Sequence, residues 1–316
     1  MRTGLRRRAA LVLIPLAGLL IALAGCGGSS TASTPEKPVI ATDTLGTTIV
    51  IPKAAPQKII SLGATDSEIL GALNVTDRVI GVDSFTNYPP AIAAKPKVTD
   101  QNGLPVIEQI VALKPDLVLG YGGEVGQYEH QLLQAQLNVV DLPATDLAGS
   151  LNEMLLVGQL VHAEPAAEAL VRGLRQRIAA VQDKVKTETP VSVYMEVDDS
   201  NPSAPYVFGG GSFGNDLITA AGGANIFGSD TTNGGYPTES AEAIIKANPQ
   251  IIVLTEDPHY GGDPSQVAQR PGWAAIDAVK QGHVYQLNPD LLQRPGPRVV
   301  DGLEQLAKLL HPSLFA

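Results

Sequence analysis

The sequence predicts an α/β fold of two similar Rossmann-like lobes, each with a parallel sheet, joined by one long backbone helix. The first observation is that short β-rich runs alternate with helical runs in both halves, as in parallel sheets with helices on their faces. The second is a helical stretch of about 21 residues, 165–185, between the two alternating regions. The third is a helix–strand unit at residues 107–120 that recurs at residues 241–255.

The order of the elements divides the chain into two lobes. In the first half, strands are expected at residues 58–63, 78–83, 116–120 and 138–143, and helices at 65–74, 105–114 and 128–137. In the second, strands are expected at residues 191–197, 206–210, 250–255 and 283–288, and helices at 212–222, 242–248, 272–281 and 298–312. A helix at 147–162 precedes the long one, and β-runs around Leu45 predict a hairpin at 43–52. The expected boundaries are a first lobe at 43–146, linking helices at 147–188 and a second lobe at 189–316.

The N-terminus has the pattern of an export signal. A stretch with four arginines is followed by an apolar run at residues 9–24, which is short for a membrane span. Small residues in front of Cys26 are typical of a bacterial lipobox. They predict a signal peptide at 1–25, a lipid on Cys26 and a polar tether at 26–42. The alternative is an ordinary secretory signal with an incidental cysteine.

Composition excludes several classes of protein. Cys26 is the sole cysteine, so an exported fold has no internal disulfide and depends on its core. The formal charge is −10, and near −14 without residues 1–25, which argues against nucleic-acid binding. The five histidines lack metal-ligand spacing, so neither a metal nor another cofactor is expected.

Loops after the strands predict a binding cleft, because ligands bind beyond the carboxyl ends of strands in open parallel sheets. Such loops bring aromatic residues or glycines to the ends of the strands at 84–90, 121–124, which begins with Tyr121, and 209–212. The loop "PDLLQRPGPR" holds Asp290, Arg294 and Arg298, and a guanidinium near a carboxylate suits a ligand with amides or carboxylates. For Arg298, the alternative is that it caps or pairs structurally at the start of the last helix.

A competing hypothesis is a lipoprotein serine hydrolase. "GGSFG" matches the G-x-S-x-G nucleophile elbow, with Ser212 followed by an acid, Asp257 or Asp263, and by His283. Ser212 equally suits the N-cap of the next helix. Trp273 is expected to pack in the core.

The recurring unit carries two matched carboxylates. Glu108 and Glu242 lie 134 residues apart, each in the first turn of its expected helix. The helix dipole alone favours acids there. Two matched acidic positions also suit a symmetric dimeric partner with two basic sockets.

Several stretches resemble one protein family: "KIISLGATDSEILGALNVTDRVIGVD", "NYPP", "IEQIVALKPDLVL" and "RPGPRVVDGLEQLAKLLHP". They are similar to the cobalamin and iron-siderophore binding proteins of ABC importers, the class III solute-binding proteins, from about Asp43 to Pro312. The resemblance implies a ligand held between two lobes. It also implies that Glu108 and Glu242 dock on arginines of a permease dimer, which works with an ATPase.

In the corrinoid binders of that family, the ligand cleft combines aromatic residues from both lobes with an Asp and an Arg of the last loop. The matching positions are Phe85, Tyr206, Tyr236, Asp290 and Arg294. The chain departs where the family has a tryptophan, since Gln101 or Asn102 stands there, and where Phe85 replaces a tyrosine. These departures leave the ligand open between cobalamin, another corrinoid, a ferric siderophore and haem. The resemblance implies a lipid-anchored, extracytoplasmic receptor that is not an enzyme; a sensor or adhesin without a permease is a further alternative.

Overall fold

The computed structural model describes residues 42–43, 48–121, 126–142, 146–256 and 262–315. Residues 38–316 form one compact unit. The expected signal peptide, Cys26 and nearly all of the expected tether lie outside the described residues. Among the helices of the described part, none combines the length and the apolarity needed to cross a membrane.

The first sheet is fully parallel, with strand order β2-β1-β3-β4. Its strands are β1 (Ile59–Ser61), β2 (Val79–Val82), β3 (Leu117–Tyr121) and β4 (Val139–Leu142). Its helices are α1 (Ala64–Ala72), α2 (Pro90–Ala93), α3 (Ile107–Leu113) and α4 (Gly126–Gln134), with a 3-10 turn, η1 (Thr76–Arg78). Each expected strand and helix of this half is confirmed, because its apolar runs are long and separated by clear turn residues.

The second sheet has the order β6-β5-β8-β9, with β7 also paired to β5. Its strands are β5 (Val191–Asp198), β6 (Tyr206–Val207), β7 (Gly223–Asn225), β8 (Ile251–Leu254) and β9 (Val284–Gln286). Its helices are α7 (Phe213–Ala220), α8 (Ala241–Ala247), α9 (Pro264–Val267), α10 (Asp277–Gln281) and α11 (Pro289–Leu292). Three 3-10 turns complete this half, η2 (Thr232–Gly235), η3 (Trp273–Ala275) and, at its end, η4 (Pro312–Leu314).

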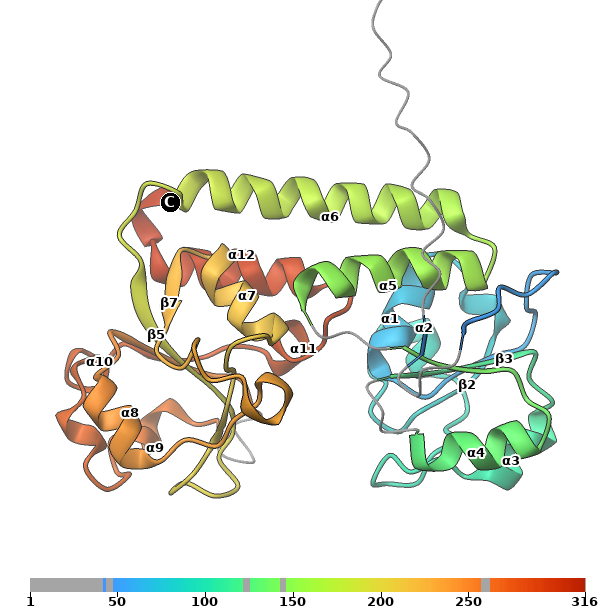
Figure 1. Cartoon of the computed structure of the whole chain (residues 1–316), viewed down its shortest axis with the longest axis horizontal. Coiled ribbons are helices and arrows are strands. Elements are labelled where there is room, and N and C mark those ends of the chain that lie inside the picture. The colour runs from blue at the N-terminus through green and yellow to red at the C-terminus, as the bar shows by residue number, and fades with distance from the viewer. Residues whose placement is uncertain (1–41, 44–47, 122–125, 143–145, 257–261, 316) are drawn as a thin grey trace, which may run out of the picture. The chain divides into compact units, whose positions relative to one another are not determined.

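Two long helices link the halves, and a third long helix near the end of the second half packs against the longer of them. They are α5 (Leu147–Leu160), α6 (Glu164–Val185) and α12 (Val299–Leu310). Figure 1 shows α6 running beside α5 and α12, which it contacts. Apolar residues recur at three- and four-residue spacing on one side of α6, and Arg177 on this helix binds Asp301 and Glu304 of α12. The sequence predicts one long linking helix, and the structure shows that this helix is amphipathic.

The core follows the alternation of the strands. Ile59 packs in the main cluster beneath α1, α5 and α6, while its neighbour Ile60 packs on the opposite face of the first sheet. In the second sheet, Val193 faces the main cluster and Tyr194 faces the other side. Successive strand residues point to opposite faces, so a sheet covered on both faces buries every residue of its strands.

The repeated unit is present in both halves. Helices α3 and α8 have seven residues each and end at a left-handed residue, Lys114 (φ 51°) and Asn248 (φ 48°). A proline follows each, and then a central strand, β3 or β8.

Three local expectations differ from the structure. The hairpin at 43–52 is represented by an isolated antiparallel bridge between Thr42 and Thr48, and residues 44–47 are outside the described part. The helix expected at 272–281 divides into η3 and α10, because Ile276 is extended (ψ 136°) between them. Strand β6 runs antiparallel to β5, whereas a parallel strand was expected.

Candidate functional site

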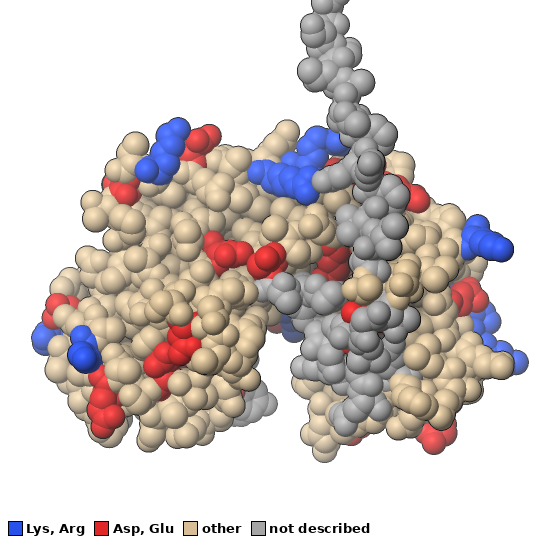
Figure 2. Space-filling model, viewed as in Figure 1, with Lys and Arg blue, Asp and Glu red and all other residues tan. Residues whose placement is uncertain are grey.

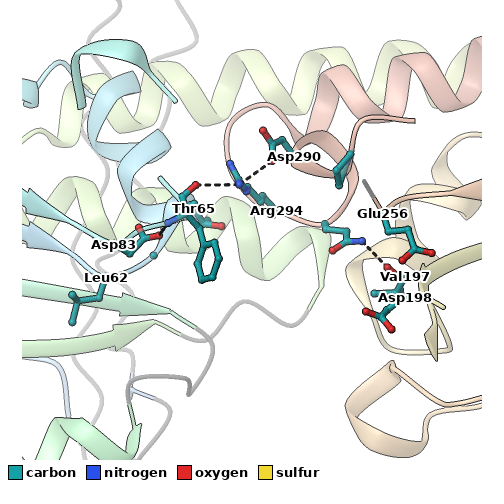
Figure 3. Close-up of a pocket in the computed structure, with 13 residues that line it drawn as sticks. Leu62, Thr65, Asp83, Val197, Asp198, Glu256, Asp290 and Arg294 are labelled. Carbon is teal, nitrogen blue, oxygen red and sulfur yellow. Dashed lines mark hydrogen bonds and ion pairs between the residues drawn. The ribbon is translucent and has the colours of Figure 1, made fainter. Parts of the chain in front are cut away.

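A cavity of about 620 Å³ lies where the carboxyl ends of β1, β2 and β5 meet the loop after β8 and α11. Figure 3 shows Leu62, Thr65 and Asp83 on one side, Val197, Asp198 and Glu256 on the other, and Arg294 with Asp290 between them. The volume is within the usual range for small-molecule sites. The cavity lies at the place where the topology of open parallel sheets predicts a ligand.

The first-lobe wall is formed by the turns after β1 and β2. Asp83 ends β2 and accepts hydrogen bonds from the backbone N–H groups of Phe85 (2.7 Å) and Thr86 (3.0 Å). The Phe85 ring is 55% exposed and packs on Gly103, where an added Cβ would lie 2.5 Å from Phe85 Cε2. Phe85, one of the predicted ligand residues, is among the residues that line the cavity.

The second-lobe wall is anchored by Gln293. Its Nε2 donates to the carbonyls of Val197 (2.9 Å) and Thr255 (2.7 Å), at the ends of β5 and β8. These hydrogen bonds fix α11, and with it Asp290, against the carboxyl edge of the second sheet.

An acidic cluster lies behind this wall. The buried Arg270 donates to both oxygens of Glu196 (2.7 and 2.8 Å) and to Asp199 (2.6 Å). Glu256 completes the group, and burial, reinforced by the charge of Asp199, raises its pKa to about 8. Among the described residues, Glu196, Asp199 and Glu256 are close enough to hold an ion, but two of these carboxylates already bind Arg270. Arg270 also lies 4.7 Å from the ring centroid of Trp273, which is fully buried as expected.

Buried ion pairs cross between the lobes beside the cavity. Glu68 of α1 is 2% exposed and accepts two hydrogen bonds from Arg298, at 2.9 and 2.5 Å. The Glu68 carboxylate raises the pKa of Arg298, whose guanidinium also lies 4.3 Å from the Tyr88 ring centroid. Arg298 therefore has the structural pairing that was its alternative interpretation.

Arg294 and Asp290, two of the predicted ligand residues, line the cavity. Arg294 Nη2 lies 2.8 Å from Asp290 Oδ1, and Arg294 Nη1 lies 3.5 Å from Glu68. Asn87, on the first-lobe loop after β2, contacts both residues: its Oδ1 accepts from Arg294 (2.7 Å) and its Nδ2 donates to Asp290 (2.9 Å).

Three other predicted ligand residues, Tyr206, Tyr236 and Gln101, are not among the described residues that line the cavity. Tyr206 is 42% exposed and pairs in register with Asp198, so it stands near the rim. Tyr236 packs on Phe208 with 5.6 Å between ring centroids, and burial raises its pKa to about 12. Gln101 is exposed in the turn that supports Phe85. Tyr121 ends β3, and its side chain lies outside the described residues.

The glycine-rich loop at 209–212 is not at the ligand edge, and this expectation was wrong. Because β6 is antiparallel, the loop leaves from the opposite edge of the sheet. A Cβ at Gly209 or Gly210 would lie 2.4 Å from a backbone oxygen, so these glycines permit close packing of the chain. Ser212 is fully buried; its Oγ donates to Gly209 O (2.7 Å) and accepts from Asn215 N (3.2 Å). Ser212 is thus the N-cap of α7.

The remaining members of the expected triad take other roles. Asp263 caps α9, and Asp257 is outside the described residues. The His283 ring stacks on Tyr285 at 6.5 Å between centroids. These roles give the hydrolase hypothesis no support.

The two matched carboxylates are exposed. Glu108 and Glu242 each lie in the first turn of their helix, α3 or α8, and both are accessible to a partner.

Several acidic residues were missed by sequence reasoning. Asp83, Asp198 and Glu256 line the cavity, and each lies at the end of a strand or within two residues after it, a signal that could have identified them. Asp66 and Glu153 are buried in the first lobe with no hydrogen-bond partner for any carboxylate oxygen. Burial, with the charge of Asp141, raises the pKa of Glu153 to about 8. Nothing in the sequence distinguishes these two from ordinary helix-surface acids.

Comparisons with known proteins agree with this geometry. The model of the family described as "Periplasmic binding protein" matches residues 59–291. The uncharacterized ABC transporter substrate-binding lipoprotein YvrC of Bacillus subtilis is 32% identical, over 95% of this chain and 97% of its own length. The vitamin B12-binding protein of Vibrio cholerae is 25% identical, over 80% of this chain and 89% of its own.

Solved structures show the same similarity. A periplasmic haem-binding protein of Pseudomonas aeruginosa superposes with a TM-score of 0.71 and 28% identity, covering 82% of this chain and 94% of that one. A possible iron-binding protein of Staphylococcus epidermidis gives a TM-score of 0.71 and 27% identity, covering 82% of this chain and all of that one.

Proposed function

The chain belongs to the periplasmic binding protein family, and on that basis we propose that it is a lipid-anchored receptor that delivers a corrinoid to an ABC permease. A ferric siderophore or haem is the alternative ligand, since relatives with 25–28% identity are named for vitamin B12, haem and iron. The receptor performs no covalent chemistry. Its ligand lies in the cavity that Arg294 and Asp290 border.

The charge of the side chains that line the cavity favours one of the candidate ligands over the others. The described lining includes three charged carboxylates, Asp83, Asp198 and Asp290, and one guanidinium, Arg294, while Glu256, with a pKa raised to about 8, is mostly protonated near pH 7. Such a lining repels the carboxylates of haem and the anionic groups of catecholate siderophore complexes. A corrinoid instead presents neutral amides at its rim and apolar faces to Phe85. The acidic lining thus favours the corrinoid.

Delivery to the permease depends on Glu108 and Glu242. Both are exposed, and each begins a copy of the repeated unit, so they suit a partner with twofold symmetry. Figure 2 shows acidic and basic side chains interspersed on the viewed face, without a continuous basic patch on its described residues. This agrees with a protein partner.

The N-terminal pattern places the receptor outside the cytoplasm. The lipid on Cys26 holds it at the membrane, and residues 26–42 act as the tether. A single acyl chain anchors weakly, so a second lipid group on the same terminus is expected.

Calorimetry of residues 27–316 tests the ligand. The titrants are cyanocobalamin, dicyanocobinamide, haem, and one neutral and one anionic ferric siderophore. We expect one-to-one corrinoid binding that weakens at least tenfold in Arg294→Ala, since a charged hydrogen bond contributes about 1.5–3 kcal/mol. Binding of haem alone, with no corrinoid signal, would refute the charge argument. In that case Asp198→Asn would leave the affinity for haem unchanged instead of raising it.

Uptake by cells tests the docking. Glu108→Lys with Glu242→Lys should abolish transport and leave ligand affinity intact. The matched control is Glu168→Lys with Glu188→Lys, two exposed carboxylates at α6 and just after it. Transport that survives the first pair would favour a sensor or adhesin.

A further inference from the structure

Three carboxylates of the second lobe converge behind the wall of the cavity. Glu196 and Asp199 come from the end of β5 and the residue just after it, and Glu256 comes from the loop after β8. Each offers one oxygen, and the three oxygens lie within 4.8 Å of one another. The parallel pairing of β5 with β8, in which Glu196 lies opposite Leu254, brings the two acid-bearing strand ends to the same edge of the sheet.

A single buried cation neutralises part of this group. Arg270 donates to both oxygens of Glu196 and to Asp199 Oδ2. It supplies one positive charge against three carboxylates, so negative charge remains in excess when all three are ionised. Burial and the charge of Asp199 raise the pKa of Glu256 to about 8, so near pH 7 this carboxyl holds a proton in place of a second counter-charge.

Glu256 has an oxygen that the described part of the protein does not use. The residue is 7% exposed, and its Oε1 is buried without a hydrogen-bond partner among the described residues. Its Oε2 accepts one long hydrogen bond, from Asp199 N at 3.3 Å. An unpaired, buried carboxylate oxygen that faces two further carboxylates is costly, and a bound cation removes that cost.

The type of donor selects a hard divalent cation. All three groups offer carboxylate oxygens, whereas zinc and copper favour nitrogen and sulfur ligands. Ca²⁺ accepts six to eight oxygens in a flexible geometry that includes waters, whereas Mg²⁺ demands a near-ideal octahedron. Glu256 also lines the cavity, which gives an ion a path of entry and leaves room for its waters. Figure 3 shows Glu256 on the wall that it shares with Asp198. The cluster therefore suits Ca²⁺ best.

We propose that Glu196, Asp199 and Glu256 form a calcium site in the second-lobe wall of the cavity, with Glu256 Oε1 as a ligand. The ion takes the place of the Glu256 proton and joins the loop after β5 to the loop after β8. Arg270 keeps its bonds to the other two acids and opposes the charge of the ion. We therefore expect a Kd of about 10⁻⁴–10⁻³ M, as in extracellular calcium modules. The site lies within one lobe and does not depend on which ligand or permease the receptor serves.

The sole tryptophan of the chain provides a local probe of this site. The ring centroid of Trp273 lies 4.7 Å from the guanidinium of Arg270, which contacts two of the acids. Tb³⁺, a luminescent substitute for Ca²⁺, is therefore sensitised by Trp273 when it binds there. Residues 27–316, which contain the whole compact unit, are titrated with TbCl₃ at pH 7 under tryptophan excitation. We expect saturable terbium emission that CaCl₂ reverses.

Glu256→Gln is the decisive variant, because it keeps the shape of the side chain and removes its charge. It should weaken terbium and calcium binding by about tenfold or more, since even supporting residues of metal sites have effects of this size. The matched control is Glu168→Gln, an exposed carboxyl of α6, which should behave as the wild type. Equal terbium emission from Glu256→Gln and the wild type would overturn the site.

Urea denaturation tests the site without terbium. CaCl₂ at about 10 mM, roughly tenfold above the highest expected Kd, should raise the urea midpoint of the wild type, because the ion binds the folded state alone. Glu256→Gln should show no such shift, and its cooperative unfolding without calcium establishes that it is folded. MgCl₂, and NaCl at the same ionic strength, should act more weakly on the wild type. A calcium shift that NaCl reproduces, or one that Glu256→Gln retains, would contradict the proposal.

Discussion

Replacing Glu153 by Gln should remove a large part of the pH dependence of stability. Glu153 is 4% exposed in α5, and neither of its carboxylate oxygens has a hydrogen-bond partner. Burial is the main cause that raises its pKa from 4.5 to about 8, and the charge of Asp141 adds to it. The folded protein therefore keeps a proton that the unfolded chain loses.

The sign follows from the two pKa values. Below pH 4.5 both states are protonated, and the contribution of Glu153 to stability is fully present. Between pH 4.5 and about 8 the unfolded chain ionises first, so the free energy of unfolding falls as the pH rises. At about 1.4 kcal/mol per pKa unit, the loss from pH 4.5 to 8 is about 3–5 kcal/mol.

Urea denaturation of residues 38–316 at several pH values between 4.5 and 8.5 measures this loss. Any constant cost of burying the Gln amide cancels, because only the slope with pH is compared. Glu153→Gln should be much flatter than the wild type over this range. Glu168→Gln, an exposed carboxyl of α6, serves as the control and should follow the wild type. Curves of Glu153→Gln and wild type that run parallel within about 0.5 kcal/mol would refute the reasoning.

Three further predictions concern residues around the cavity and α7. Arg298→Met leaves the buried Glu68 carboxylate without its main partner, so urea denaturation should show a free energy of unfolding lower by about 3–5 kcal/mol. The double variant Glu68→Gln with Arg298→Met should recover part of this loss. No recovery would contradict a direct pairing of the two residues. Ser212→Ala should lower stability by about 1 kcal/mol through loss of the α7 cap, and any esterase activity that disappears with it would revive the hydrolase. Gly103→Ala should cost about 1–2 kcal/mol, because φ is +84° there, and should weaken ligand binding by displacing Phe85. Unchanged affinity in Gly103→Ala would show that the Phe85 ring does not contact the ligand.

The repeated unit shows how much of the fold can be predicted from the local pattern of residues. In both copies an apolar helix ends before a proline, because the residue before proline avoids the right-handed helical region. The expected β3 and β8 follow directly, so the two-lobe fold could be predicted from residue order alone. The direction of β6 could not, because its two residues carry no information on parallel or antiparallel pairing.

The pairings of the charged residues show which part of the candidate site could be predicted from the sequence and which could not. Asp290 and Arg294 stand four residues apart in a stiff loop, and that proximity in sequence brings them together in space. Asn87 lies 207 residues from Arg294, and Glu68 lies 230 residues from Arg298. Their partnerships depend on how the lobes meet, which no local spacing specifies.

The sequence by itself determined the alternation of elements, the amphipathic long helix and the two matched carboxylates, because each is written in the spacing of neighbouring residues. Only the tertiary structure decided which acids are buried, which strand turns back and which side chains share the cavity. Those outcomes arise from contacts between segments that are distant in the sequence. The desolvation of a side chain and its choice of partner depend on its surroundings in the fold, so the residue type alone does not predict them.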